Sequence, residues 1–165
     1  ERTLAGLEWV IASMHPPVFP PQDPDAHTAA WLGVVKNPHV DVIGHCGDER
    51  FRCDYEALVR ACAENGKIIE INSHSLSSRP GSDKNCKEVA LLCKHFGNPI
   101  VVSSDAHFSA SIGEFDDALR MLEEIDFPEE LILNADFDRF AAVVKKLCPR
   151  ERTFMSAAQE AENQK

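Results

Sequence analysis

The sequence lacks several features that would place it in a common functional class. It has no apolar run close to the roughly 20 residues of a membrane span, and no signal-peptide pattern at its start. It contains neither a Gly-x-Gly-x-x-Gly fingerprint nor a Walker loop, so no motif supports nucleotide binding. A formal net charge of −10 argues against binding to nucleic acids or to anionic membranes, because a protein binds either of them through clustered Lys and Arg. A small phosphorylated substrate is still compatible, since bound cations can dominate the field inside a cleft.

The six cysteines contain no Cys-x-x-Cys pair, which argues against a structural zinc ribbon. Cys86 and Cys93 lie on one face of an expected helix, together with Val89 and Ala90. We therefore expect buried, reduced thiols, and with them a cytoplasmic location.

Strand and helix patterns alternate along the chain, which predicts an α/β fold with parallel strands. The length of 165 residues and the 44% apolar content fit one domain over residues 1–149, followed by a polar tail at 150–165 that we expect to be disordered. The strands read as apolar runs covered on both faces, at 7–14, 40–44, 67–72, 99–104 and 131–133. The expected helices cover 25–36, 54–65, 85–96, 114–125 and 137–148, and segment 73–84 is expected to be a polar loop.

Metal-binding side chains follow three of the expected strands. His15, His45 and the pair Asp105 and His107 come just after strands 7–14, 40–44 and 99–104. Parallel strands bring their carboxyl ends to one face, so we expect these side chains to share a cleft. Three imidazoles and a carboxylate suit a hydrolytic metal site. The alternatives are a loop histidine held by prolines, a satisfied core histidine, and an aspartate that caps a turn beside a surface histidine.

Three polar residues near the same face have two interpretations each. Glu70 and Asn72 alternate with isoleucines, which fits either an edge strand with a solvated face or a supporting Glu and a substrate-orienting Asn. Arg79, beside Pro80-Gly81-Ser82, is either a surface side chain or a bidentate clamp for a phosphate. His74, in the same segment, is ambiguous.

Five segments carry a family resemblance. They are Ile-Ala-Ser-Met-His-Pro-Pro-Val-Phe, Val-Ile-Gly-His-Cys-Gly, Glu-Ile-Asn followed by Ser-Arg-Pro-Gly-Ser, Val-Ser-Ser-Asp-Ala-His, and Ile-Gly-Glu-Phe. In this order they resemble the PHP (polymerase and histidinol phosphatase) superfamily over nearly all of 7–145, most closely its small trinuclear-zinc phosphoesterases. The resemblance implies a distorted (β/α)7 TIM-like barrel that hydrolyses phosphoesters with up to three zinc ions, or with manganese or iron.

The resemblance also implies residue roles. His15 and His45 match two histidines that share one metal, Asp105 matches a ligand of a second, and His107 a ligand of the third. The family's opening His-x-His strand, the Asp-His after it and a bridging Glu have no counterpart here, so we expect the chain to match the C-terminal two-thirds of the family. Cys46 stands where the family often has proline, either as an extra soft ligand or as a packed side chain.

The sequence therefore predicts a metal-dependent phosphatase that acts on small phosphomonoesters, present as an incomplete piece. Because no metal would then have all of its ligands, this piece is expected to be weakly active or inactive. Two other classes stay open: a non-catalytic or degenerate metal-binding fragment, and a related metal-dependent amidohydrolase.

Missing opening strands would leave a sheet edge and apolar surface uncovered, and such an edge pairs readily with another copy. We therefore predict a homo-oligomer, or poor solubility. Light scattering of the purified chain should give a mass above that of the monomer. A clean monomer at high concentration would contradict the prediction.

Overall fold

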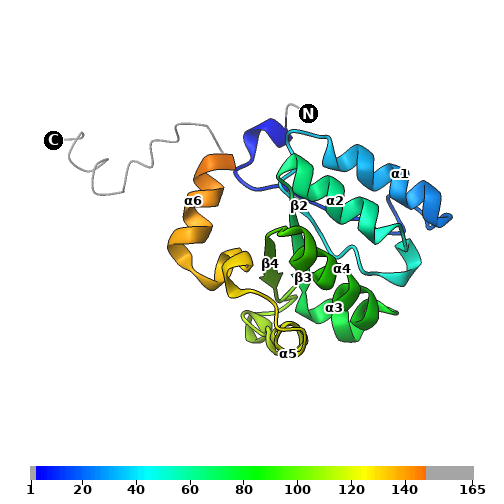
Figure 1. The fold of residues 1–165 in the computed structure, drawn as a ribbon. Helices are drawn as coiled ribbons and strands as arrows, with labels where there is room; N and C mark the ends of the chain where they lie inside the picture. The colour runs from blue at the N-terminus through cyan, green and yellow to red at the C-terminus, as the bar shows by residue number, and fades with distance from the viewer. Residues whose placement is uncertain (1–2, 148–165) are drawn as a thin grey trace.

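The structure is a computed structural model, which describes residues 3–147. Within that range the chain forms one four-stranded parallel sheet with helices around it (Figure 1). The strands lie in chain order across the sheet. They are β1 (Ile11–Ala12), β2 (Val42–Ile43), β3 (Ile68–Asn72) and β4 (Ile100–Ser103). The α/β class and the parallel strands are confirmed, while closure into a barrel stays a prediction.

The helices of residues 3–147 largely follow the predicted pattern. Asp54 caps one of them, because its carboxylate accepts a hydrogen bond from the Ala57 N–H at 2.9 Å. Gly66 ends the same helix with a left-handed φ of 64°. None of the described helices is long and apolar enough to cross a membrane. They are α1 (Pro24–Val35), α2 (Tyr55–Asn65), α3 (Ser73–Ser78), α4 (Ser82–Phe96), α5 (Asp116–Glu124) and α6 (Phe137–Leu147).

The prediction of a polar loop at 73–84 is wrong. That segment holds α3 and the first turn of α4, which begins at Ser82 rather than at residue 85. The side-chain carbonyl of Asn72 accepts a hydrogen bond from the Ser75 N–H at 2.9 Å and so caps α3. Four serines in six residues conceal this helix in the sequence, since serine is a weak helix former in isolation.

Two predicted strands are also corrected. The strand expected at 7–14 pairs with its neighbour only over Ile11–Ala12, and Leu7 before it is half exposed. The strand expected at 131–133 consists of parts of two short 3-10 turns, and among residues 3–147 its only backbone pairing with the sheet is a parallel bridge from Ile132 to Ile100. Both segments are apolar enough for a strand, but they lack a partner strand along most of their length.

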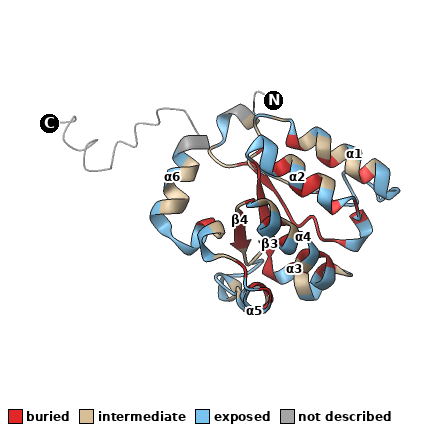
Figure 2. Ribbon diagram, viewed as in Figure 1, coloured by how far each residue is buried: buried red, intermediate tan, exposed pale blue. Residues whose placement is uncertain are grey.

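The larger core lies between the sheet and helices α1, α2, α4 and α5, and most of the strand residues are buried (Figure 2). All five described cysteines are buried there and free, as predicted; Cys148 and the tail at 150–165 lie outside the described residues. Burial raises the pKa of the Cys53, Cys62 and Cys86 thiols to about 12, which keeps them protonated. The cytoplasmic location stays a prediction.

A smaller core lies on the other face of the sheet. Val42, Ile68 and Val101, one from each of three strands, form its base. Phe140 of α6 covers them together with Trp9, and the two rings meet edge to face with centroids 5.4 Å apart. Helix α6 therefore closes the face that the other helices leave open.

The outer edge of β4 is capped by a side chain rather than by a full strand. The Asn134 carboxamide accepts a hydrogen bond from the Val102 N–H at 2.9 Å and donates one to the Val102 carbonyl at 2.8 Å. This pair of bonds reproduces what a neighbouring strand would offer. At the opposite edge β1 has no outer partner strand among residues 3–147, and Ile11 is half exposed.

His27, which the sequence analysis does not single out, holds the loop segment at Gln22 against the core. It is 2% exposed, and its Nε2 accepts a hydrogen bond from the Gln22 N–H at 2.8 Å. Its Nδ1 donates to the Arg52 carbonyl at 2.8 Å, and its ring packs edge to face on Phe19 and Phe51. Two backbone segments far apart in the sequence thus depend on one neutral imidazole.

His27→Ala should lower the free energy of unfolding by about 2–4 kcal/mol, because it leaves a cavity and two unpaired backbone groups. Urea denaturation followed by circular dichroism measures the change. His39→Ala, in a loop residue whose imidazole has no recorded contact, is the matched control and should change the value little. Equal effects of the two substitutions would contradict the role of His27.

Candidate active site

Two of the predicted ligands meet at the carboxyl ends of β1 and β2. The Nε2 atoms of His15 and His45 are 3.1 Å apart, and the ring centroids are 4.7 Å apart. His45 is buried, whereas His15 is exposed and also contacts the Ser13 hydroxyl at 3.0 Å. At this distance one ring nitrogen donates a hydrogen bond to the other, and both nitrogens lie near enough to a common point to act as a pair of metal ligands.

The backbone at His45 is held in an unusual conformation. Its φ is +33°, in the left-handed region that residues with a side chain rarely adopt. The His45 N–H donates to Oε2 of Glu70 at 2.8 Å. Gly44 allows this turn, because a Cβ there would lie 2.8 Å from Cγ2 of Ile11. Such strain persists where the surroundings enforce it, and it is concentrated at functional sites.

Glu70 itself lies in the middle of the sheet, so the interpretation of β3 as a solvated edge strand is wrong. All five residues of β3 are buried between β2 and β4. The second oxygen of Glu70, Oε1, accepts a hydrogen bond from the Ser103 hydroxyl at 2.7 Å. The buried carboxylate is thus satisfied by groups at the ends of both neighbouring strands.

Asp105 follows β4 and carries the same kind of backbone strain, with φ +50°. Its Oδ2 lies 3.4 Å from Nη1 of Arg79. Burial raises the pKa of Asp105, but hydrogen bonds from Asn72 and Arg79 together with the Arg79 charge outweigh it, so the net pKa is lowered. Asp105 is therefore an anion at neutral pH, and Asn72 contacts it while also capping α3.

Arg79 is held from a second side by Asp48, a residue to which the sequence analysis gave no role. Nε of Arg79 lies 3.8 Å from Oδ2 of Asp48, whose side chain is 1% exposed. Asp48 also pairs with Arg50 through both carboxylate oxygens. Arg79 is consequently not a free surface side chain: its exposed fraction is 15%, and it lies between two carboxylates. The only sequence signal for Asp48 is its place three residues after His45.

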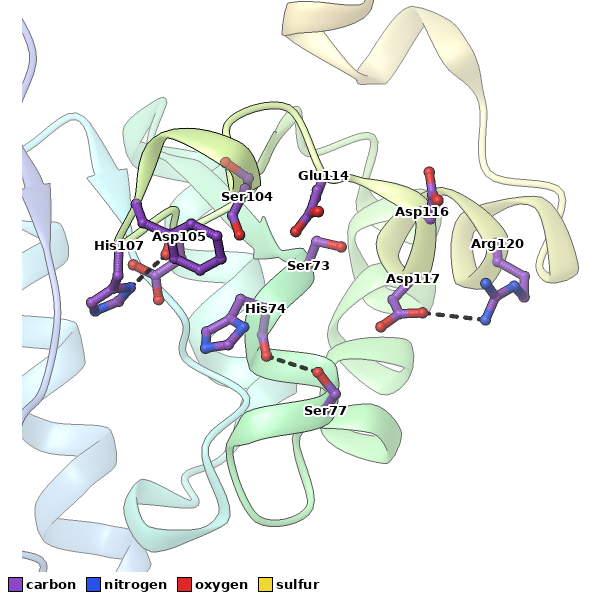
Figure 3. A pocket seen from close by; sticks show the side chains of 12 residues that line it. Ser73, His74, Ser77, Ser104, Asp105, His107, Glu114, Asp116, Asp117 and Arg120 are labelled. Atoms are coloured by element: carbon purple, nitrogen blue, oxygen red, sulfur yellow. Dashed lines mark hydrogen bonds and ion pairs between the residues drawn. The ribbon is translucent and has the colours of Figure 1, made fainter.

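His107 lies on the wall of a cavity of about 530 Å³ beside Asp105. Its Nδ1 donates to the Asp105 carbonyl at 2.8 Å, which leaves Nε2 as the free acceptor. His74 of α3 faces it with ring centroids 6.0 Å apart, so the structure assigns this histidine to the site (Figure 3). The wall formed by α5 adds Asp116, Asp117 and Arg120, which the sequence analysis did not single out.

The predicted ligands form a partial set. Among residues 3–147, no three His, Cys, Asp or Glu side chains form a group that could hold a metal ion. His15 and His45 are together, Asp105 is paired with Arg79, and His107 lines the cavity. Cys46 is buried in the core with a pKa raised well above its usual range by burial, which favours the packed side chain over the extra ligand.

No family model matches the chain. Individual relatives do match it, and the three described here share the name probable phosphatase. A protein of Acetivibrio thermocellus named probable phosphatase is 44% identical over 152 residues, covering 92% of this chain and 63% of the relative. A protein of the same name from Caldanaerobacter subterraneus is 41% identical over 165 residues, covering 99% of this chain and 63% of the relative. One from Clostridium acetobutylicum is 38% identical over 146 residues, covering 88% of this chain and 60% of the relative.

The chain is homologous to proteins named probable phosphatase. It spans about 63% of the length of the first two relatives. In the Caldanaerobacter relative the aligned region covers 99% of this chain, so it contains the strand ends that carry the candidate site.

The pKa of His45 is lowered to about 4, first by burial and then by the charges of Arg79 and His15. Its ordinary value is 6.5, so the unfolded chain takes up a proton at a higher pH than the folded one. We predict that this residue's contribution to stability is complete above about pH 6.5 and is lost progressively as the pH falls toward 4.

Thermal unfolding of the wild type and of His45→Gln at several pH values between 7.5 and 4.5 measures this contribution. The melting temperature should fall less steeply with decreasing pH in the variant than in the wild type. His95→Gln, at an exposed position near the end of α4, should keep the wild-type slope. Equal slopes of melting temperature against pH for His45→Gln and the wild type would contradict a lowered pKa of His45 in the folded chain.

Proposed function

We propose that this chain is a major part of a metal-dependent phosphatase of the PHP type that hydrolyses small phosphomonoesters. The observation that carries the proposal is the His15–His45 pair at adjoining strand ends, with its nitrogens 3.1 Å apart, in a chain homologous to proteins named probable phosphatase. The names of these relatives favour ester cleavage at phosphorus over the amide cleavage of a related amidohydrolase.

The donor atoms have the right chemistry for zinc, but they are too few. Zinc takes four ligands from nitrogen, sulfur or oxygen, and His15 and His45 offer two nitrogens. In the proposal Asp105 and His107 bind further metal ions, and the missing ligands come from water or from protein beyond the part that the structure describes. The length of the relatives, of which this chain covers about 63%, is compatible with that source.

The neutral state of His45 suits this role. Because its pKa is lowered to about 4, the imidazole is neutral at neutral pH, as a metal ligand must be. Its backbone N–H donates to Glu70, which fixes the backbone from which the ring extends, and its Nε2 lies beside Nε2 of His15. A metal ion held there would generate a nucleophilic hydroxide near neutral pH and neutralise phosphoryl oxygens.

Arg79 and Asn72 are proposed to orient the phosphate. Nε and Nη1 of Arg79 face Asp48, Asp105 and Ser75, and among the described residues no partner is recorded for Nη2. The guanidinium is thus fixed in direction while part of its donor fork is available to a phosphate oxygen. Asn72 contacts Asp105 and caps α3, and in this way it holds the carboxylate beside the phosphate position.

A non-catalytic metal-binding fragment is the second candidate. The observation in its favour is that no three-ligand group exists among residues 3–147. Elemental analysis of a protein of the full length of the relatives separates the two, because the proposal itself leaves the metal sites of this chain short of ligands. Less than about one tightly held metal ion per chain supports the fragment, because a structural or catalytic zinc is bound strongly.

Asp105→Asn and His107→Ala, introduced into a protein of the full length of the relatives, should lower metal content and turnover of p-nitrophenyl phosphate. Loss of a group that holds a metal should cost at least about 10- to 100-fold in affinity or activity. His95→Ala is the control and should leave both unchanged. Wild-type metal content and turnover in both site variants would defeat the assignment.

A further inference from the structure

The cavity beside Asp105 and His107 extends away from the position proposed for the phosphate. Figure 3 shows Asp105 and His107 at one end, Asp117 and Arg120 at the other, and Ser73 and His74 between them. Its volume of about 530 Å³ is within the range of small-molecule sites. We infer that this cavity binds the alcohol part of the substrate, and that this part is a neutral polyol or sugar. The inference rests on the proposed function.

The charge of the cavity disfavours a second anionic group. Asp116 and Asp117 occupy the first turn of α5, and Glu114 lies just before it. The first turn of a helix would otherwise attract an anion, but here the chain's own carboxylates occupy that place. The one cationic side chain that lines the cavity among the described residues, Arg120, is paired with Asp117 at 3.2 Å. A bisphosphate or a phosphorylated acid would therefore meet repulsion at this end.

The hydrogen-bonding groups favour hydroxyls over an ammonium group. Glu114 and Asp116 accept hydrogen bonds. Arg120 only donates, and four serine hydroxyls do both. A polyol offers donors and acceptors together and matches this mixture, whereas an ammonium could only donate and would leave the Arg120 donors unmatched.

The lining also argues against a nucleobase. Among the described residues that line the cavity, Phe108 is the one phenyl ring, and it is 66% exposed at the rim. A base would need an apolar or aromatic slot to bury its faces, and the walls here are mostly serine, histidine and carboxylate. One exposed ring can still pack against the C–H face of a sugar or polyol.

The test compares four probes by titration of the purified chain, followed through its backbone amide NMR signals. The probes are inorganic phosphate, sorbitol 6-phosphate, phosphoethanolamine and 3-phosphoglycerate. Sorbitol 6-phosphate should bind at least about fivefold more tightly than inorganic phosphate, since two or more added hydrogen bonds contribute. It should also shift signals of α3 and α5, while inorganic phosphate shifts only those around Arg79.

A bulky side chain on the cavity wall tests the location. Ser77 and Ser78 are adjacent and exposed on α3, and both hydroxyls donate to the His74 carbonyl, but only Ser77 lines the cavity. Ser77→Trp should weaken sorbitol 6-phosphate binding at least about fivefold and leave inorganic phosphate unchanged. Ser78→Trp, the matched control, should change neither.

The outcomes separate this inference from the proposed function. Inorganic phosphate binding at Arg79, with no gain for sorbitol 6-phosphate or no loss in Ser77→Trp, overturns the polyol pocket and leaves the phosphatase proposal intact. Tighter binding of phosphoethanolamine or 3-phosphoglycerate than of the polyol ester overturns the ligand class. If none of the four probes binds, both proposals are overturned.

Discussion

The candidate site depends on the two hydrogen bonds that the Glu70 carboxylate accepts. This carboxylate is buried in the central strand, and it links the ends of the two neighbouring strands through the His45 N–H and the Ser103 hydroxyl. A buried carboxylate is costly unless its oxygens are satisfied, so the strand ends are constrained to stay near it. The turn at His45, left-handed and preceded by Gly44, exists within that constraint. The backbone at His45, one member of the imidazole pair, is thus held from the central strand of the sheet.

Hydrophobic patterning was enough to predict most of the fold. Strands 40–44, 67–72 and 99–104 and the helices after them are apolar in patterns that only a covered parallel sheet explains, and the structure has β2, β3 and β4 at these places. Helix α3 was missed because its cap, Asn72, lies in a strand and its body is serine. In the segments at 7–14 and 131–133, by contrast, more strand was predicted than the structure has. An apolar sequence does not show whether a partner strand lies beside it.

The site was predictable as a set of residue types and much less as a set of contacts. Strand-end position alone predicted the meeting of His15 and His45, because parallel strands end at one face. The ion pairs of Arg79 with Asp48 and Asp105 depend on the position in which α3 places Arg79, and no local sequence pattern predicts that position. Asp48, Asp116 and Asp117 look like solvated acids in the sequence, and only the folded chain brings them to the site or its cavity.

The Asn134 carboxamide has a consequence for the way this molecule can associate. It occupies both the N–H and the carbonyl of Val102, and so it blocks the β4 edge, one of the two edges (borders) at which the sheet could pair with another strand. Residues 3–147 then present a single border for pairing, at β1. Copies that pair through this border would satisfy each other's free backbone groups and leave no edge to extend, so we predict that such association stops at a closed, twofold pair.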